Sequence, residues 1–279
     1  MNNSSERTTE LIAKLNQGIA ELCSTAKWVD FLQMLDRFHA YSFNNTLLIL
    51  TQKPEATRVA GFNAWRKLDR FVRKGEKGIW ILAPMVYKND SGDEPSADEP
   101  TKVIRGFKPV PVFDVSQTDG AELPEVCIRL DGEDEAGLYE RLRAFASSIG
   151  FAVEDADDLN GANGMCSHDE HRIQVLASNS PVQRVKTLAH ELGHAILHAP
   201  GEGRPDSRAV LELEAESVAF VVCAAAGITT DDYSFGYVAT WSGGGDEALA
   251  AIKASGARIQ RAADQILSAL DTVELEEVA

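Results

Sequence analysis

The stretch His190-Glu191-Leu192-Gly193-His194 combines the residue types of a divalent metal site with a carboxylate beside them. Residues four apart lie on one face of an α-helix, so His190 and His194 can direct their imidazoles at one ion. Two imidazoles and a carboxylate suit Zn²⁺, and an open fourth position leaves room for water. Glu191 can take a proton from that water rather than bind the ion. The spacing therefore predicts a hydrolytic zinc centre with Glu191 as the catalytic base.

The residues around this stretch predict a buried helix that carries it. Ser180 is a typical N-cap, Pro181 suits the first helical position, and Gln183 can close a capping box. Pro200-Gly201 ends the segment. An apolar stripe at helical spacing runs through Val185, Leu188, Leu192, Ala195 and Ile196. The alternative, two unconnected histidines and an exposed Glu191, does not account for this agreement between motif and helix.

A third ligand is expected from the helical segment 211–220. Glu212 and Glu216 are four apart and share a face, whereas Glu214 lies about 200° around the helix from Glu212. One of the first pair should bind the ion, and the other should accept the free ring N–H of a ligating histidine. The arrangement resembles that of gluzincin peptidases, which implies Glu212 as the ligand and Glu216 as the supporting residue. Three solvated glutamates are the alternative, which the apolar remainder of the helix disfavours.

His198 continues the four-residue spacing of the histidines but is not expected to bind the ion. It lies two turns, roughly 12 Å, along the axis from His190, too far for both to reach one metal. A helix-end position near the dipole or the surface is expected instead. Cys166 could approach the zinc, although nothing in its spacing requires this.

The composition indicates two domains whose charges differ. The 279 residues carry a net charge of −16, but residues 1–115 hold 16 Lys/Arg against 14 Asp/Glu, and the remainder holds 11 against 29. We expect domains at 1–117 and 129–279, a linker at 118–128 and an overall α+β class. Without an apolar run of about 18 residues, a leader or framework cysteines, we expect a cytoplasmic protein with no membrane contact.

The N-terminal half reads as α+β. Apolar stripes predict helices over 11–22 and 28–38, and 57–60 should be a strand leading into a helix capped by Asn63. Strands are expected at 79–87, 101–107 and 110–115, with 88–100 as a flexible acidic loop.

Basic and aromatic side chains alternate between residues 58 and 87, a pattern that suits single-stranded nucleic acid. Cations follow the phosphates, and aromatic faces stack unpaired bases at roughly 1–3 kcal/mol each. Composition alone favours the alternative of aromatics in a core and lysines at the surface. The candidate DNA-binding residues are Arg58, Phe62, Trp65, Arg66, Lys67, Arg70, Arg73, Lys74, Lys77 and Trp80.

A family resemblance favours DNA binding. Several stretches resemble, in order, the motifs of the ArdC-type antirestriction N-terminal domain: Tyr41-Ser42-Phe43-Asn44-Asn45, Ala60-Gly61-Phe62-Asn63-Ala64-Trp65, Arg73-Lys74-Gly75-Glu76-Lys77-Gly78 and Val112-Phe113-Asp114-Val115-Ser116-Gln117-Thr118. The resemblance implies a protein of plasmids and phages that binds single-stranded DNA and ends in a mainly helical, zincin-like metallopeptidase domain with a small sheet. The second half also resembles the ImmA/IrrE metallopeptidases, which leaves its protein substrate open.

The C-terminal half should surround the zinc helix with further elements. We expect helices at 133–149 and 246–270 and strands at 151–153 and 172–176. The second strand, just before the zinc helix, could form the edge along which a peptide lies. Residues 233–241 could approach the site.

Three functions stay open on the sequence. The first is a zinc endopeptidase tethered to single-stranded DNA, acting in antirestriction and on an unidentified protein. The second is a non-catalytic coat of single-stranded DNA with structural zinc, and the third is an ImmA-like peptidase that cleaves a repressor. The intact Glu191 favours a working enzyme, because a structural site has no use for a base.

Overall fold

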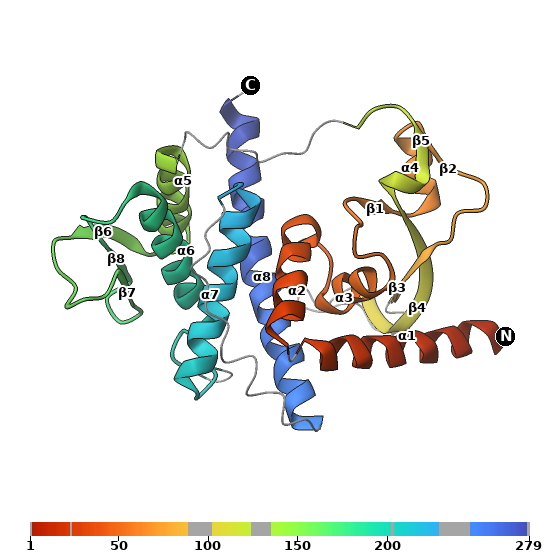
Figure 1. The fold of residues 1–279 in the computed structure, drawn as a ribbon, viewed down its shortest axis with the longest axis horizontal. Helices are drawn as coiled ribbons and strands as arrows, with labels where there is room; N and C mark the ends of the chain where they lie inside the picture. The colour runs from red at the N-terminus through yellow and green to blue at the C-terminus, as the bar shows by residue number, and fades with distance from the viewer. Residues whose placement is uncertain are drawn as a thin grey trace, which may run out of the picture. The chain divides into compact units, whose positions relative to one another are not determined.

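The computed structural model describes residues 2–22, 24–88, 102–123, 135–201, 204–228 and 246–277, and its secondary structure is α+β, as expected (Figure 1). The chain divides into two compact units, residues 1–18 with 47–123 and residues 19–46 with 124–279. This division differs from domains at 1–117 and 129–279, because residues 19–46 pack with the C-terminal part. Within the described ranges, none of the helices has the length and apolar character needed to span a bilayer.

The first unit is built on a long antiparallel hairpin. Strands β3 (Ile79–Lys88) and β4 (Lys102–Asp114) form it, and the short β1 (Val59–Ala60) pairs with the end of β4. The expected strands at 101–107 and 110–115 are thus one strand, with a register shift opposite Pro84 and Val86. The expected acidic loop at 88–100 lies almost wholly outside the described residues.

Asp114 holds the end of the hairpin to the segments beside it. Its carboxylate accepts the backbone N–H groups of Thr57, Arg58 and Ser116 at 2.8–3.1 Å. The Gln117 side chain closes a capping box on the short 3-10 turn at Val115–Gln117. Asp114 is only 1% exposed, so these bonds replace the water that the carboxylate loses.

A second small sheet corrects two expectations. Strands β2 (Arg70–Val72) and β5 (Thr118–Gly120) pair antiparallel, so the predicted linker at 118–128 begins with a strand, while 124–134 lies outside the described residues. Helix α4 (Phe62–Lys67) precedes β2, and its N-cap is Gly61 rather than Asn63. Gly61 makes no side-chain cap bond, so the boundary is set by backbone geometry.

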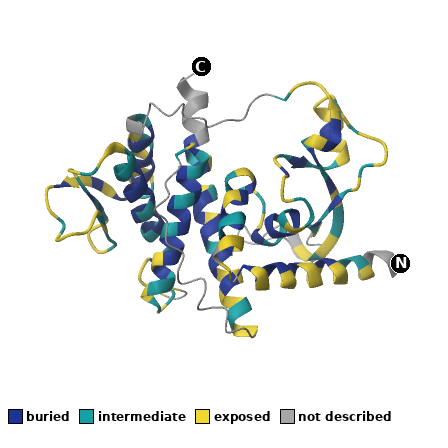
Figure 2. Cartoon of the chain, in the orientation of Figure 1, coloured by how far each residue is buried: buried dark blue, intermediate teal, exposed yellow. Residues whose placement is uncertain are grey.

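Helices form most of the second unit. α2 (Thr25–Phe38), α5 (Glu135–Ser148), α6 (Pro181–Leu197), α7 (Arg208–Ala225) and α8 (Asp246–Glu277) make it up, with α7 in contact with α2, α6 and α8 (Figure 1). The sides on which α6, α7 and α8 meet are buried (Figure 2). The indole N–H of Trp28 donates to Ser217 at 3.1 Å, which ties α2 to α7. The two remaining helices, α1 (Asn2–Glu21) and α3 (Phe43–Gln52), cross the boundary between the units.

A three-stranded sheet of order β6-β8-β7 covers α6. β6 (Ala152–Ala156) is parallel to β8 (Arg172–Leu176), and β7 (Gly164–Ser167) is antiparallel to it. The expectation that 172–176 forms an edge is therefore wrong, because β8 is central and the unforeseen β7 takes the edge. β7 also contacts α6 and so lies beside the histidines.

Candidate metal centre

The zinc helix begins and ends close to the expected residues. The Ser180 hydroxyl accepts the N–H of Gln183 at 3.3 Å, and Pro181 occupies the first turn of α6. The Gln183 side chain donates to Thr187 at 3.1 Å instead of closing a capping box. The apolar face of α6 is buried, and this burial fixes which side of the helix presents the histidines.

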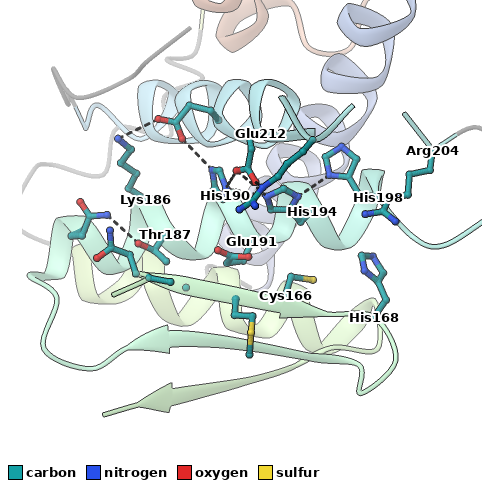
Figure 3. Close-up of a pocket in the computed structure, with 17 residues that line it drawn as sticks. Cys166, His168, Lys186, Thr187, His190, Glu191, His194, His198, Arg204 and Glu212 are labelled. Carbon is teal, nitrogen blue, oxygen red and sulfur yellow. Dashed lines mark hydrogen bonds and ion pairs between the residues drawn. The ribbon is translucent and has the colours of Figure 1, made fainter. Parts of the chain in front are cut away.

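His190, His194 and Glu212 bring one potential ligand atom each to a common point. The two Nε2 atoms lie 3.1 Å apart, and an oxygen of Glu212 lies 3.4 Å from the Nε2 of His190 and 3.6 Å from that of His194. These three side chains point toward one another from α6 and α7 (Figure 3). Two imidazoles and a carboxylate are a donor set that Zn²⁺ accepts, so the residues fit a divalent ion.

Glu216 supports His190 from the same helix as Glu212. Its carboxylate lies 3.1 Å from the Nδ1 of His190 and 3.5 Å from the ammonium of Lys186. Because a carboxylate only accepts hydrogen bonds, the Nδ1 of His190 carries a proton, and the Nε2 is the ring nitrogen that faces the ligand point. Burial disfavours the protonated form of His190, but hydrogen bonding to Glu212 and Glu216 outweighs this and raises the pKa of His190 to about 9. A proton and a metal ion therefore compete for this nitrogen.

Glu191 sits under the ligand atoms, against the edge strand. It is 7% exposed, and burial raises the pKa of its carboxyl above the ordinary value. A Cβ on Gly164 of β7 would lie 2.8 Å from a Glu191 oxygen and 2.5 Å from a Thr187 methyl. Any other residue at position 164 would displace the Glu191 carboxylate or the Thr187 methyl group. Gly164 was not foreseen, although a glycine in a strand is a known signal of close approach.

The ligand point opens into a cavity of about 630 Å³. β7 lines one wall with Gly164, Met165 and Cys166, and Arg204 and Arg208 also line the cavity, with Arg204 on the His198 side (Figure 3). Burial and the nearby Glu191 raise the pKa of the Cys166 thiol to about 12. The predicted approach of residues 233–241 lies outside the described part of the chain.

His198 differs from expectation, and Glu214 lies beside it. His198 is 2% exposed rather than at the surface, and its Nδ1 lies 2.8 Å from the Nδ1 of His194. Glu214, completely buried, lies 3.2 Å from the other nitrogen of His198 and pairs with Arg258 of α8. Burial opposes ionisation of Glu214, but hydrogen bonds from His198, Arg258 and Ser255 hold its pKa below the ordinary value.

The candidate DNA-binding residues fall into three groups in the structure. Phe62, Arg66, Lys67, Lys74 and Lys77 are exposed. Three others form the second group and bind neighbouring protein groups: the buried Trp65, the partly buried Arg70 and the exposed Arg73.

In the second group, the burial of Trp65 corrects the sequence prediction, whereas DNA contacts by Arg70 and Arg73 stay predictions. Trp65 is 2% exposed and donates to the carbonyl of Phe113 at 2.8 Å, so it cannot stack a base. Arg70 binds Thr118 and Ala121, and Arg73 pairs with Glu76 and Asp119. These side chains hold β2, β5 and the following turn together.

The third group holds two partly accessible candidates, and two apolar residues nearby in the sequence are exposed. Trp80 is partly covered, with the guanidinium of Arg7 3.9 Å from its ring centroid, and the Arg58 N–H is bound by Asp114. Leu68 and Phe71 are 50% and 56% exposed close to the exposed bases in the sequence. The alternation of basic and aromatic residues could not distinguish these from Trp65.

Comparison with known families identifies the two parts of the chain. The N-terminal domain of anti-restriction factor ArdC matches residues 1–113, and the IrrE N-terminal-like domain matches residues 152–228. The chain is an ArdC-type protein. Its recognition from sequence is therefore confirmed, and its second half has the fold of an M78-type, metallopeptidase-like domain.

Individual relatives have low sequence identity to this chain. An uncharacterized protein of Bacillus anthracis is 22% identical over 87% of this chain and 48% of its own length. An uncharacterized protein of Sinorhizobium fredii is 27% identical over 48% of this chain and 43% of its own length. The chain thus spans about half the length of the curated relatives it matches.

Two solved structures of the antirestriction ArdC protein of plasmid R388 are similar in fold. The Mn(II)-bound form is 22% identical, with a TM-score of 0.50 over 82% of this chain and 84% of that one. The metal-free form is 23% identical, with a TM-score of 0.49 over 82% and 85%.

Proposed function

We propose that this chain is an antirestriction protein of a mobile element that acts in the cytoplasm, binds single-stranded DNA and carries a zinc-dependent endopeptidase. The observation that carries the peptidase is the convergence of His190, His194 and Glu212 beside the buried Glu191. DNA binding is supported by the ArdC domain and by the exposed bases and aromatic ring around Phe62.

The proposed metal ligands are His190, His194 and Glu212, with Glu216 holding His190. A divalent ion at the homologous fold in the Mn(II)-bound relative supports a metal here, and the two imidazoles favour zinc. When bound, zinc lowers the pKa of water and polarises a carbonyl group.

The chain's own residues supply the remaining chemistry. Glu191 accepts the proton of the attacking water and returns it to the leaving amine, a task for which its raised pKa suits it. The outer edge of β7, which pairs with no strand in the described part of the chain, can pair with an extended peptide and lay its backbone across the cavity.

Glu191→Gln tests the peptidase. The full-length variant should fold, bind zinc and bind single-stranded oligonucleotides as wild type does. Cleavage of casein, or of its own chain with DNA added, should fall at least about 10²-fold, as is typical of base removal. Glu140→Gln, at an exposed glutamate of α5, is the matched control. Equal cleavage by wild type and Glu191→Gln would disprove the mechanism.

Oligonucleotide binding tests the DNA half. Single strands should bind more tightly than duplex, with little sequence preference and an affinity that falls steeply with salt. Lys67→Ala with Lys74→Ala should weaken binding and flatten the salt dependence by about 0.7 per lost phosphate contact. Lys253→Ala, at an exposed lysine of α8, serves as control. Equal affinity for duplex would contradict the proposal.

A repressor-cleaving peptidase is the second candidate function. The IrrE N-terminal-like match over 152–228 favours it. Here cleavage would be confined to one folded regulator and would be independent of DNA. Cleavage of casein stimulated by single-stranded DNA would exclude this alternative.

A further inference from the structure

A chain of buried polar contacts leads away from the metal centre behind His194. The Nδ1 of His194 lies 2.8 Å from the Nδ1 of His198, drawn as a dashed line in Figure 3. The Nε2 of His198 lies 3.2 Å from a Glu214 oxygen. Two groups of α8 donate hydrogen bonds to Glu214. These are the hydroxyl of Ser255 at 2.6 Å and the Nε of Arg258 at 3.1 Å.

Hydrogen-bond chemistry determines where the protons lie along this chain. Glu214 receives hydrogen bonds from Arg258 and Ser255, and as a carboxylate it can only accept. The Nε2 of His198 therefore carries a proton and donates it, which leaves a lone pair on Nδ1 of the neutral ring. The short contact between the two Nδ1 atoms then requires a proton on the Nδ1 of His194. The Nε2 of His194 is therefore unprotonated, and its lone pair faces the ligand point.

We infer that Glu214 positions the metal ligand His194 through His198, by holding both rings in the tautomers that aim the His194 Nε2 lone pair at the ion. The inference rests on the proposed metal centre. His190 receives the same support directly from Glu216 at 3.1 Å. The three alternate glutamates of α7 thus act on the same proposed centre. Glu212 binds the ion, Glu216 orients the imidazole of His190, and Glu214 orients that of His194 through His198.

Burial of Glu214 and His198 costs free energy, so their presence in the interior calls for an explanation. Glu214 is completely buried and His198 is 2% exposed, so each loses its hydration and depends on its partners. An apolar pair would fill this space between α6, α7 and α8 without that loss. The reaction assigned to Glu191 uses neither group, and among the described residues they reach the proposed centre through His194.

Metal affinity and ligand geometry test the inference in the full-length protein. His198→Leu removes both hydrogen-bonding atoms, whereas His198→Gln keeps an acceptor for His194 and a donor for Glu214. Zn²⁺ affinity, from chelator competition, should fall about 10–100-fold in His198→Leu and recover largely in His198→Gln. The visible spectrum of the Co²⁺ form should change in parallel. His168→Leu is the matched control, because His168 lines the same cavity but bonds only to the carbonyl of Ala195 among the contacts described.

Ring-nitrogen NMR of the zinc-loaded wild type gives a second test that needs no variant. It should place the proton of His198 on Nε2 and that of His194 on Nδ1. A His198 ring protonated on Nδ1, or His198→Leu with wild-type Zn²⁺ affinity and Co²⁺ spectrum, would overturn the inference. A loss of thermal stability without either change would mean a merely structural role. If the wild type itself binds neither ion, the proposed metal centre is wrong. This outcome differs from one in which the metal binds but Glu214 and His198 do not position His194.

Discussion

Glu212, Glu214 and Glu216 alternate along one helix, yet each meets a different environment. Glu212 is half exposed, and hydrogen bonds with His190 and His194 hold its pKa far below the ordinary value. Glu214 is completely buried beside Arg258, and Glu216 lies between His190 and Lys186. The three proposed roles of these identical side chains therefore follow from the different partners that each one meets.

The assignment of ligand and supporting residue can be tested by comparing two variants. Glu212→Gln should lose zinc almost completely, because it replaces the charged oxygen that faces both Nε2 atoms. Glu216→Gln should weaken binding about 10–100-fold, since the amide still contacts His190. Zinc content after dialysis and chelator competition measure both, with Glu170→Gln at an exposed glutamate as control. The reverse order would make Glu216 the ligand.

At the scale of elements, the metal centre depends on how closely α6 and α7 approach. A Cβ on Gly193 would lie 2.9 Å from the Cα of Ala215 and 3.3 Å from its carbonyl oxygen. These are backbone atoms that cannot rotate away. Gly193 therefore allows the contact that brings Glu212 within reach of the histidines.

Gly193→Ala should consequently separate the two helices. Alanine gains about 1 kcal/mol of helix propensity, but overpacking against backbone costs about 1–3 kcal/mol, so we expect a net loss of stability. Zinc affinity should fall as Glu212 moves from the imidazoles. Denaturant unfolding and zinc competition measure the two effects. Gly61→Ala, where a Cβ meets nothing within 4 Å, is the control. Unchanged zinc affinity would show that the helices adjust without moving the ligands.

A second prediction at this scale concerns Asp114 and pH. Burial opposes its ionisation, but hydrogen bonds from Ser116, Thr57 and Arg58 outweigh it and hold the pKa below the ordinary 3.8. The folded state thus binds a proton less readily than the unfolded chain. The stabilisation is complete above that value and is lost as pH falls through the lower, folded-state pKa.

Asp114→Asn should remove this dependence. At pH 7 the free energy of unfolding should fall by about 1–3 kcal/mol, because an amide group then faces backbone donors. The difference from wild type should shrink below pH 3.8, which urea unfolding followed at Trp65 would show. Asp119→Asn, at an exposed aspartate, is the comparison. A difference independent of pH would contradict the charge-based explanation.

At the scale of the whole molecule, opposite charges separate the proposed tasks. Residues 1–115 have a small basic excess, whereas the remainder is strongly acidic and would repel phosphate. The family domains divide at the same region of the chain. The proposed DNA binding and the proposed peptide hydrolysis are therefore assigned to different parts of the chain, and we expect that a substitution can remove one without the other.

This separation predicts the behaviour of variants in cells. Lys67→Ala with Lys74→Ala should lower protection of incoming DNA from restriction, because fewer charges hold the strand. The transfer frequency of a plasmid into restriction-proficient and restriction-deficient recipients measures this protection, with Lys253→Ala as control. Full protection by the double variant would disconnect DNA binding from antirestriction. Glu191→Gln in the same assay decides whether the peptidase contributes.

The sequence alone was enough for whatever depends on local spacing. The i, i+4 histidines, the Ser180-Pro181 start of α6 and the apolar stripes of α2 and α5 follow from helix geometry, so those elements lie close to where they were predicted. The two-part family organisation was also recognisable, since its motifs are contiguous.

Tertiary structure decided which side chains are buried and what they meet across elements. Trp65 and Phe62 occur in one short motif, yet only packing against β4 shows that Trp65 is internal. β7 was missed because its four residues acquire a strand's hydrogen bonds only from β8. The pairing of His198 with Glu214 joins residues 16 apart on different helices. Such contacts depend on how α6, α7 and α8 pack, and the periodicity of one helix carries no information about its neighbour.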